Sequence, residues 1–88
     1  MILRALIARG TSALDQGGIP NAARDARLLA AHVCDIDPSR VTLHEMDEVA
    51  EAVIARFDDA ITQRLNHRPV SRIIGGAAIL GSQFSDYG

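Results

Sequence analysis

The stretch from Val49 to Leu65, VAEAVIARFDDAITQRL, has the clearest helical period in this 88-residue chain. Its apolar residues recur three and four positions apart, which places them on one face of an α-helix. That face consists of Val49 or Ala50, Val53, Ile54, Phe57, Ile61 and Leu65. The polar residues between them fall mostly on the opposite face. The stretch therefore predicts a long amphipathic helix that packs against other helices.

Signals at both ends delimit this helix. The acidic residues of the segment 45–51 lie at its start, where negative charge suits the positive end of the helix dipole. Asp47 among them is a candidate N-cap. At the other end Arg68 precedes Pro69, and a residue before proline is pushed away from helical angles. We therefore expect the helix to end at residues 66–67.

Two helices are predicted upstream. Apolar residues at helical spacing from Ile2 to Leu14 indicate the first, and the glycines at 17–18 stop it. Asn21 is a candidate N-cap for the second helix, which ends near residues 34–35. We expect Arg24, Asp25 and Arg27 to lie nearer the polar side of this second helix.

A third, short helix is predicted from Asp37-Pro38 to about His44, because an N-cap followed by proline is a typical helix start. After Pro69 we expect a short helical turn from Val70 to Ile74 that Gly75-Gly76 closes. The residues from 77 to 87 then fit a hairpin, with strands at 77–80 and 83–87 and a turn at Gly81-Ser82.

The composition agrees with helix-on-helix packing. It is 48% hydrophobic but only 3% aromatic, and a β-sandwich would need more aromatic and β-branched residues. We therefore predict an all-α fold: a small bundle of about four to five helices, with a C-terminal connector able to form part of a β-hairpin.

Charge and cysteine content narrow the class of protein. A net charge of −2 disfavours direct nucleic-acid binding, including a helix-turn-helix DNA binder. No apolar run approaches the length of a membrane span, so we expect no membrane partner. The single cysteine, Cys34, permits no intrachain disulfide and fits a reducing, cytoplasmic setting.

No residue pattern in the chain indicates an active site. The three histidines have no recognised metal-ligand spacing, and Cys34 has no activating base nearby in sequence. Asp58 and Asp59 point about 100° apart on a helix, so they do not converge on one atom. The C-terminal glycines lack the context of a phosphate loop. We therefore assign no catalytic, cofactor-binding or metal-binding residue.

The tail resembles the junction of a known family. Residues 69–75, Pro-Val-Ser-Arg-Ile-Ile-Gly, followed by Leu80-Gly81 and Phe84, are similar to the pattern Pro-Val-Ala-Tyr-Ile-x-Gly-x-x-Glu-Phe-Trp-Gly-x-x-Phe. This pattern belongs to the HemK/PrmC-type release-factor glutamine methyltransferases. Residues 25–33 resemble the family's Asp-Ala-x-Leu-Leu-Leu-Ala-His-Val helix. Arg56-Phe57 and Gln63-Arg64 match its Arg-Phe … Arg-Arg helix. The resemblance covers almost the whole chain in order.

The chain departs from the family pattern in the connector. Arg72 stands where an aromatic residue is common, Ala78-Ile79 replace Glu-Phe, and Leu80 replaces an aromatic. The departures affect the packing of the connector and leave the helical part of the match intact.

The resemblance implies a helical bundle at residues 1–67, followed by a connector at 68–88 toward a catalytic domain that this chain lacks. Pro69, Gly75, Gly81 and Phe84 are its hinge positions. The implied parent is an S-adenosylmethionine-dependent enzyme with a Rossmann-like catalytic domain. It methylates the glutamine of the Gly-Gly-Gln motif in class-1 peptide release factors. The fragment holds neither the Asn-Pro-Pro-Tyr motif nor the cofactor glycines, so it is not expected to catalyse alone.

The partners implied by the resemblance are a class-1 release factor, which the helical domain helps to recognise, and the protein's own catalytic domain. The candidate partner-facing residues are the arginines expected to be exposed, Arg24, Arg27, Arg56 and Arg64. The alternative is a free-standing helical adaptor or dimerisation module without a catalytic domain.

Overall fold

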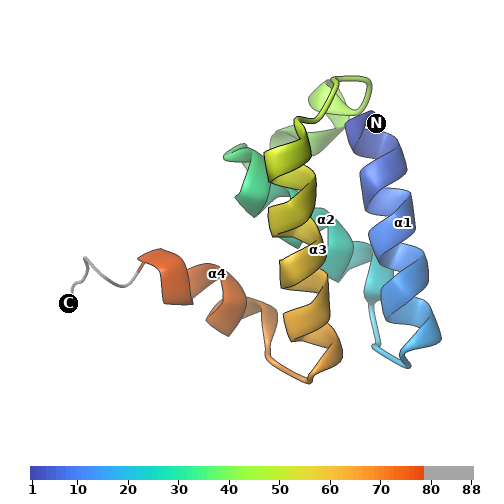
Figure 1. Ribbon diagram of the computed structural model, residues 1–88, viewed down its shortest axis with the longest axis vertical. Coiled ribbons are helices and arrows are strands. Elements are labelled where there is room, and N and C mark those ends of the chain that lie inside the picture. Colours follow the sequence, from blue (N-terminus) through green and yellow to red (C-terminus); the bar gives the residue numbers. More distant parts are fainter. Residues whose placement is uncertain (79–88) are drawn as a thin grey trace.

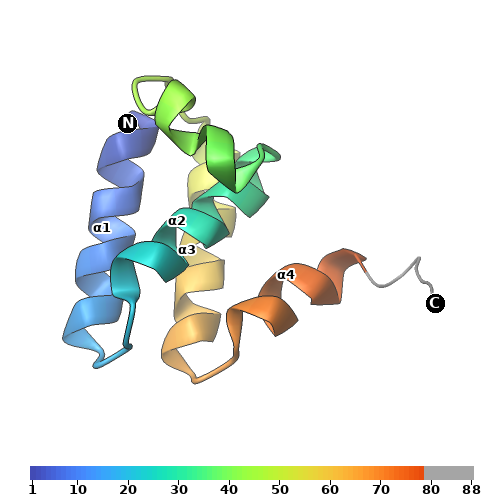
Figure 2. The ribbon, with the colours of Figure 1, turned by 180° about the vertical axis from the view of Figure 1, so that it is seen from behind.

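The computed structural model describes residues 1–78, which form four α-helices and one short 3-10 helix. These elements are α1 (Leu3–Gln16), α2 (Ala22–Cys34), η1 (Pro38–His44), α3 (Glu51–Leu65) and α4 (Val70–Ala78). Helices α1 and α3 lie side by side and run in the same direction (Figure 1). Helix α2 crosses them on the other side (Figure 2). The predicted all-α bundle of four to five helices is confirmed.

The core lies where α1, α2 and α3 meet. Its largest fully buried side chains are Phe57, Leu3, Leu6, Leu14 and Leu29. Helix α2 adds mostly alanines, which let the neighbouring helices approach it closely. Because these residues recur at helical spacing, α1 and α3 each turn one continuous apolar face inward.

Two glycines allow α1 to lie directly against α3. A Cβ atom added at Gly10 would lie 2.7 Å from Cε2 of Phe57 and 3.1 Å from Cδ1 of Ile61. One added at Gly17 would clash with Cδ2 of Leu65. Seven positions separate Gly10 from Gly17, so both lie on the same side of α1. Both glycines therefore face α3 at close range, a role that the sequence pattern did not reveal.

Two predicted N-caps need correction. Asn21 occupies the N-cap position of α2, but its backbone is left-handed, with φ of 59°, and its side chain makes no capping hydrogen bond. Asp47 does not cap α3, whose N-cap is Ala50. The acidic segment lies mostly before α3, because the chain turns at residues 45–47 and then pairs at Glu48 with Ile2 before α3 begins. By contrast, the Asp37 cap is confirmed: its Oδ1 accepts hydrogen bonds from the Ser39 backbone N–H and hydroxyl at 2.9 and 2.7 Å.

The loop between η1 and α3 caps α1 with its backbone. The N–H groups of Leu3 and Arg4 donate to the carbonyls of Asp47 and Glu45, each at 2.9 Å. The N–H of Val49 donates in turn to the Met1 carbonyl at 2.9 Å. The first N–H groups of a helix have no partner within it. The loop satisfies two of them, so α1 needs no side-chain cap.

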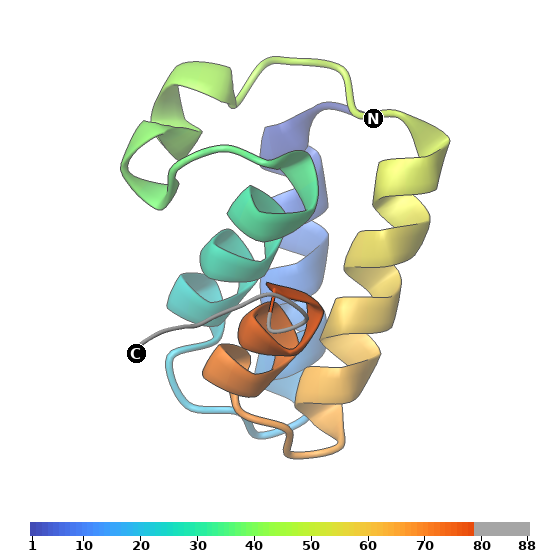
Figure 3. The ribbon, with the colours of Figure 1, turned by 90° about the vertical axis from the view of Figure 1, so that its left-hand side faces the viewer.

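The C-terminal helix differs from its prediction. Helix α4 continues through Gly75 and Gly76 and includes Ala77 and Ala78, which were expected to begin a strand. Glycine costs about 1 kcal/mol in a helix relative to alanine. Burial of Ile73 against the core offsets this cost, because α4 packs on α2 and α3 (Figure 3). The remainder of the predicted hairpin, with the hinge positions Gly81 and Phe84, lies outside the described residues.

Candidate functional site

The only buried charged residue among those described is Asp25, which is 5% exposed. Its Oδ2 accepts a hydrogen bond from Nε of Arg64 at 3.0 Å, and the Arg64 side chain is 18% exposed. The expectation that Asp25 lies toward the polar side of α2 was wrong, as was the exposure expected for Arg64. The two residues form an ion pair that joins α2 to α3, so Arg64 serves packing within the bundle.

The other three candidate arginines, Arg24, Arg27 and Arg56, are exposed as expected. They do not converge on one hollow. Arg27 lines a shallow hollow with Arg4, Thr42 and Glu45, whereas Arg56 lines a groove between α2, α3 and α4. Any partner contact through these arginines would therefore use separate surfaces.

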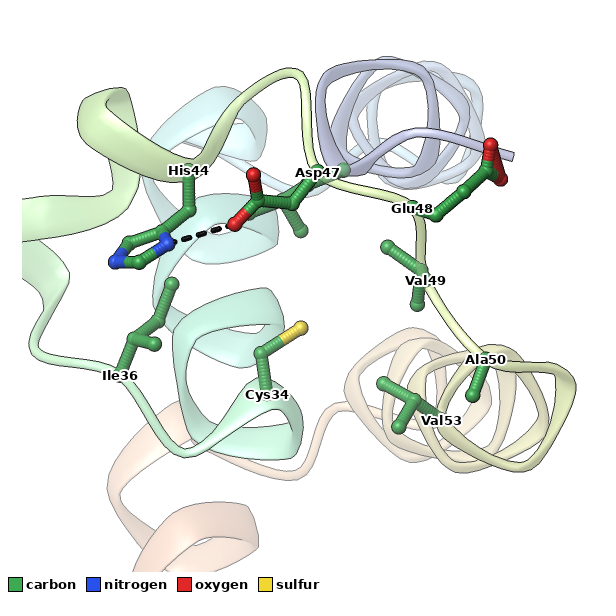
Figure 4. A pocket seen from close by; sticks show the side chains of 9 residues that line it. Cys34, Ile36, His44, Asp47, Glu48, Val49, Ala50 and Val53 are labelled. Carbon is green, nitrogen blue, oxygen red and sulfur yellow. Dashed lines mark hydrogen bonds and ion pairs between the residues drawn. The ribbon is translucent and has the colours of Figure 1, made fainter.

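A pocket lies at the end of the bundle where the η1–α3 loop passes α2 and α3 (Figure 4). Its volume is about 220 Å³. Its walls are formed by Leu3, Cys34, Ile36, His44, Asp47, Glu48, Val49, Ala50 and Val53. At one edge Nδ1 of His44 lies 2.8 Å from Oδ2 of Asp47. The pocket thus joins apolar walls to a polar edge.

The polar groups of this pocket do not form a nucleophilic site. Burial raises the pKa of the Cys34 thiol above its ordinary value, and the nearby positive charge of Arg56 only partly opposes this effect. A reactive cysteine needs the opposite shift, toward the thiolate. Nδ1 of His44 is paired with Asp47, and within residues 1–78 no hydrogen bond joins either ring nitrogen of His44 to the Cys34 thiol. Cys34 therefore behaves as a packing residue.

The raised pKa of Cys34 gives a testable prediction. Iodoacetamide should alkylate Cys34 in the folded chain more slowly than in urea at the same pH, because less thiolate is present. The Arg56→Gln variant should react more slowly still, since it removes the charge that lowers the thiol pKa. Faster alkylation of the folded wild-type chain would contradict this prediction.

The same shift sets a pH dependence. Because the pKa of the Cys34 thiol is higher in the folded chain than in the unfolded chain, this thiol contributes to stability fully below its unfolded pKa. The contribution is lost as the pH rises through the folded pKa. Cys34→Ser should remove this alkaline part of the stability profile, which thermal melts across the alkaline range would measure.

The described residues also lack other kinds of site. Residues 1–78 contain no group of three His, Cys, Asp or Glu residues that could hold a metal ion. None of their helices is long and apolar enough to cross a membrane. Of the glycines, Gly10 and Gly17 face α3 side chains and Gly75 lies inside α4.

Comparison with known proteins gives a consistent family. The model of the PrmC N-terminal domain matches residues 5–75. A release factor glutamine methyltransferase of Cereibacter sphaeroides is 43% identical over 93% of this chain and 28% of the relative. One of Rhodospirillum rubrum is 36% identical over 85% of this chain and 23% of the relative. The chain thus spans about a quarter of the length of these relatives.

A third relative has a different printed activity. A 4-amino-L-phenylalanine/4-methylamino-L-phenylalanine methyltransferase of Streptomyces pristinaespiralis is 39% identical over 84% of this chain and 25% of the relative. No solved structure matches the chain significantly. Relatives of this bundle are therefore named as methyltransferases with more than one kind of substrate.

Proposed function

Because this chain belongs to the family of PrmC N-terminal domains, we propose that it is the release-factor recognition domain of a protein-(glutamine-N5) methyltransferase. The observation that supports this proposal most directly is the extent of the family match. Residues 5–75 include α2, η1 and α3 entire, with most of α1 and α4. The match therefore concerns the whole bundle and not a single helix.

In this proposal the chemistry takes place in a separate catalytic domain, which binds S-adenosylmethionine and holds the glutamine of the Gly-Gly-Gln motif. The bundle contacts the class-1 release factor and positions it. Residues 68–88 connect the two domains, and Arg24, Arg27 and Arg56 on the exposed helix faces are candidate contacts. The protein acts in the cytoplasm, and it contacts neither nucleic acid nor membrane directly.

Titration of the isotope-labelled chain with a class-1 release factor from the same source tests this role. We expect shifts of backbone NMR signals that are confined to one surface and saturate at micromolar to millimolar concentration. Contact without the catalytic domain is weak because the two domains together bind more tightly than either alone.

Two controls separate the alternatives. A response to 4-amino-L-phenylalanine in place of the release factor would favour a small-molecule methyltransferase. A dimer in sedimentation equilibrium, without any release-factor contact, would favour the adaptor or dimerisation module. In either case the proposed function is wrong.

A further inference from the structure

The large exposed apolar side chains of residues 1–78 gather at one end of the bundle. They are Met1, Leu43 and Met46, and Leu43 and Met46 are 74% and 70% exposed. The Val49 N–H bonds to the Met1 carbonyl, which brings the start of the chain beside the loop that contains Met46. Leu43 and Met46 lie three positions apart and are both exposed, so this end of the bundle is a candidate contact surface.

The backbone that presents Leu43 and Met46 is fixed. Val41, two positions before Leu43, is 2% exposed and anchors η1 in the core. The carbonyls of Glu45 and Asp47 on either side of Met46 accept the N–H groups at the start of α1. The exposure of these two side chains is therefore not a consequence of a loose loop. A surface held in place before binding loses little conformational freedom when a partner docks.

This end of the bundle is also acidic. The segment 41–55 contains Glu45, Asp47, Glu48 and Glu51 but no Arg or Lys. Asp47 is paired with His44, and Glu48 with the Met1 ammonium group. Within residues 1–78, neither Glu45 nor Glu51 has an ion-pair partner within 4 Å, although Glu45 lines a hollow together with Arg4 and Arg27. Two unpaired carboxylates beside an apolar patch complement a surface that combines basic and apolar side chains.

The 220 Å³ pocket adds a receptor for an anchor residue. His44 and Asp47, which line its edge, are the sequence neighbours of Leu43 and Met46 (Figure 4). Its walls include Ile36, Val49 and Val53, so a single apolar side chain entering it would meet apolar atoms on these walls and the polar groups of His44, Asp47 and Glu48 at the edge. Anchors of this kind supply most of the binding energy in protein interfaces.

We propose that Leu43, Met46 and this pocket form the docking surface for a segment of the partner protein that places basic residues beside an apolar anchor. We call this surface the acidic end. The inference rests on the proposed function, under which the partner is the class-1 release factor. It selects the acidic end over the arginine-bearing faces of α2 and α3. Helix α4 begins at the opposite end of the bundle (Figure 1).

Binding of the release factor to four double variants, measured by calorimetry and NMR, tests the acidic end. Leu43→Ser with Met46→Ser should weaken binding at least about tenfold, because it removes the apolar contacts. Glu45→Lys with Glu51→Lys should weaken it several-fold at low salt and less at high salt, since salt screens exposed charges. All four residues lie on the surface or near it, and an unchanged thermal melt would show that the variants fold.

Two further variants are matched controls. Asp15→Lys with Asp59→Lys changes the net charge by the same amount away from the acidic end and should bind as the wild type does. Arg24→Glu with Arg56→Glu should also have little effect, because Arg56 lines a groove away from Glu45. If only this arginine variant loses binding, the inference is wrong and the proposed function stands. If the wild-type chain does not bind the release factor at all, both are wrong.

Two other occupants would also overturn the inference. A self-associated chain that becomes monomeric in the Leu43→Ser, Met46→Ser variant would assign the surface to a second copy. In a longer protein that includes the methyltransferase domain, amides 43–51 could already be protected from hydrogen exchange without release factor. That result would assign the surface to the catalytic domain.

Discussion

Asp25→Ala is expected to lower the free energy of unfolding by about 3 kcal/mol. The substitution leaves the Arg64 guanidinium without its partner, and the Arg64 side chain is only 18% exposed. Removing one member of a buried ion pair typically costs about 3–5 kcal/mol, because the remaining charge stays desolvated. The partial exposure of Arg64 places the expected loss at the lower end of this range. Urea denaturation followed by circular dichroism would measure it.

The Asp25 prediction has two matched controls. Asp59→Ala breaks an exposed hydrogen bond to Gln63 Nε2 on α3, 2.8 Å long, and should change stability by no more than about 0.5 kcal/mol. Asp25→Leu with Arg64→Met replaces both charges by apolar groups and should recover most of the loss. If Asp25→Ala costs no more than Asp59→Ala, the ion pair does not join α2 to α3.

Asp25 illustrates what the helical period can predict and what it cannot. The period predicted the three longer helices and nearly all their ends, because burying an apolar face determines where each helix lies. The period of α2 puts Asp25 with Arg24 and Arg27 nearer the polar side of the helix. Helix α2 crosses between its neighbours and buries more than one face, so Asp25 is enclosed with Leu29 and Ala26. The period of α2 alone cannot show that Asp25 is the polar residue that becomes buried, because its burial depends on α3, which supplies Arg64 as its partner.

The C-terminal part shows the same dependence on packing. Gly75 and Gly76 are local signals for a helix end, but α4 extends past both because Ile73 is buried against α2 and α3. The candidate pocket also could not be predicted from the sequence. Cys34 ends α2 and Val53 lies in the first turn of α3, so η1 and the loop after it separate them in the sequence. The two residues line one pocket only because that loop passes the start of α1. Nor does sequence periodicity show that Leu43 and Met46 remain exposed.

Gly10→Ala is expected to destabilise the chain by about 2 kcal/mol. Intrinsic helix propensity alone would favour alanine by about 1 kcal/mol. The new Cβ, however, would meet the ring of Phe57, which is fully buried and cannot turn aside. Overpacking of a core costs roughly 1–3 kcal/mol, because α1 must move away from α3. A loss of stability on Gly10→Ala would therefore show that α1 and α3 are in close contact at this position. Gly17→Ala should cost less, because Leu65 is only partly buried and its methyl group can rotate away.

Gly75→Ala is the matched control for Gly10→Ala. An added Cβ at Gly75 meets nothing within 4 Å, so alanine there should stabilise α4 by up to about 1 kcal/mol. The Phe57→Leu background supplies the second test. It removes the ring that the new methyl group strikes, so Gly10→Ala should cost at least about 1 kcal/mol less in that background. Equal stabilisation by alanine at positions 10 and 75 would mean that α1 and α3 do not approach each other as closely as the structure shows.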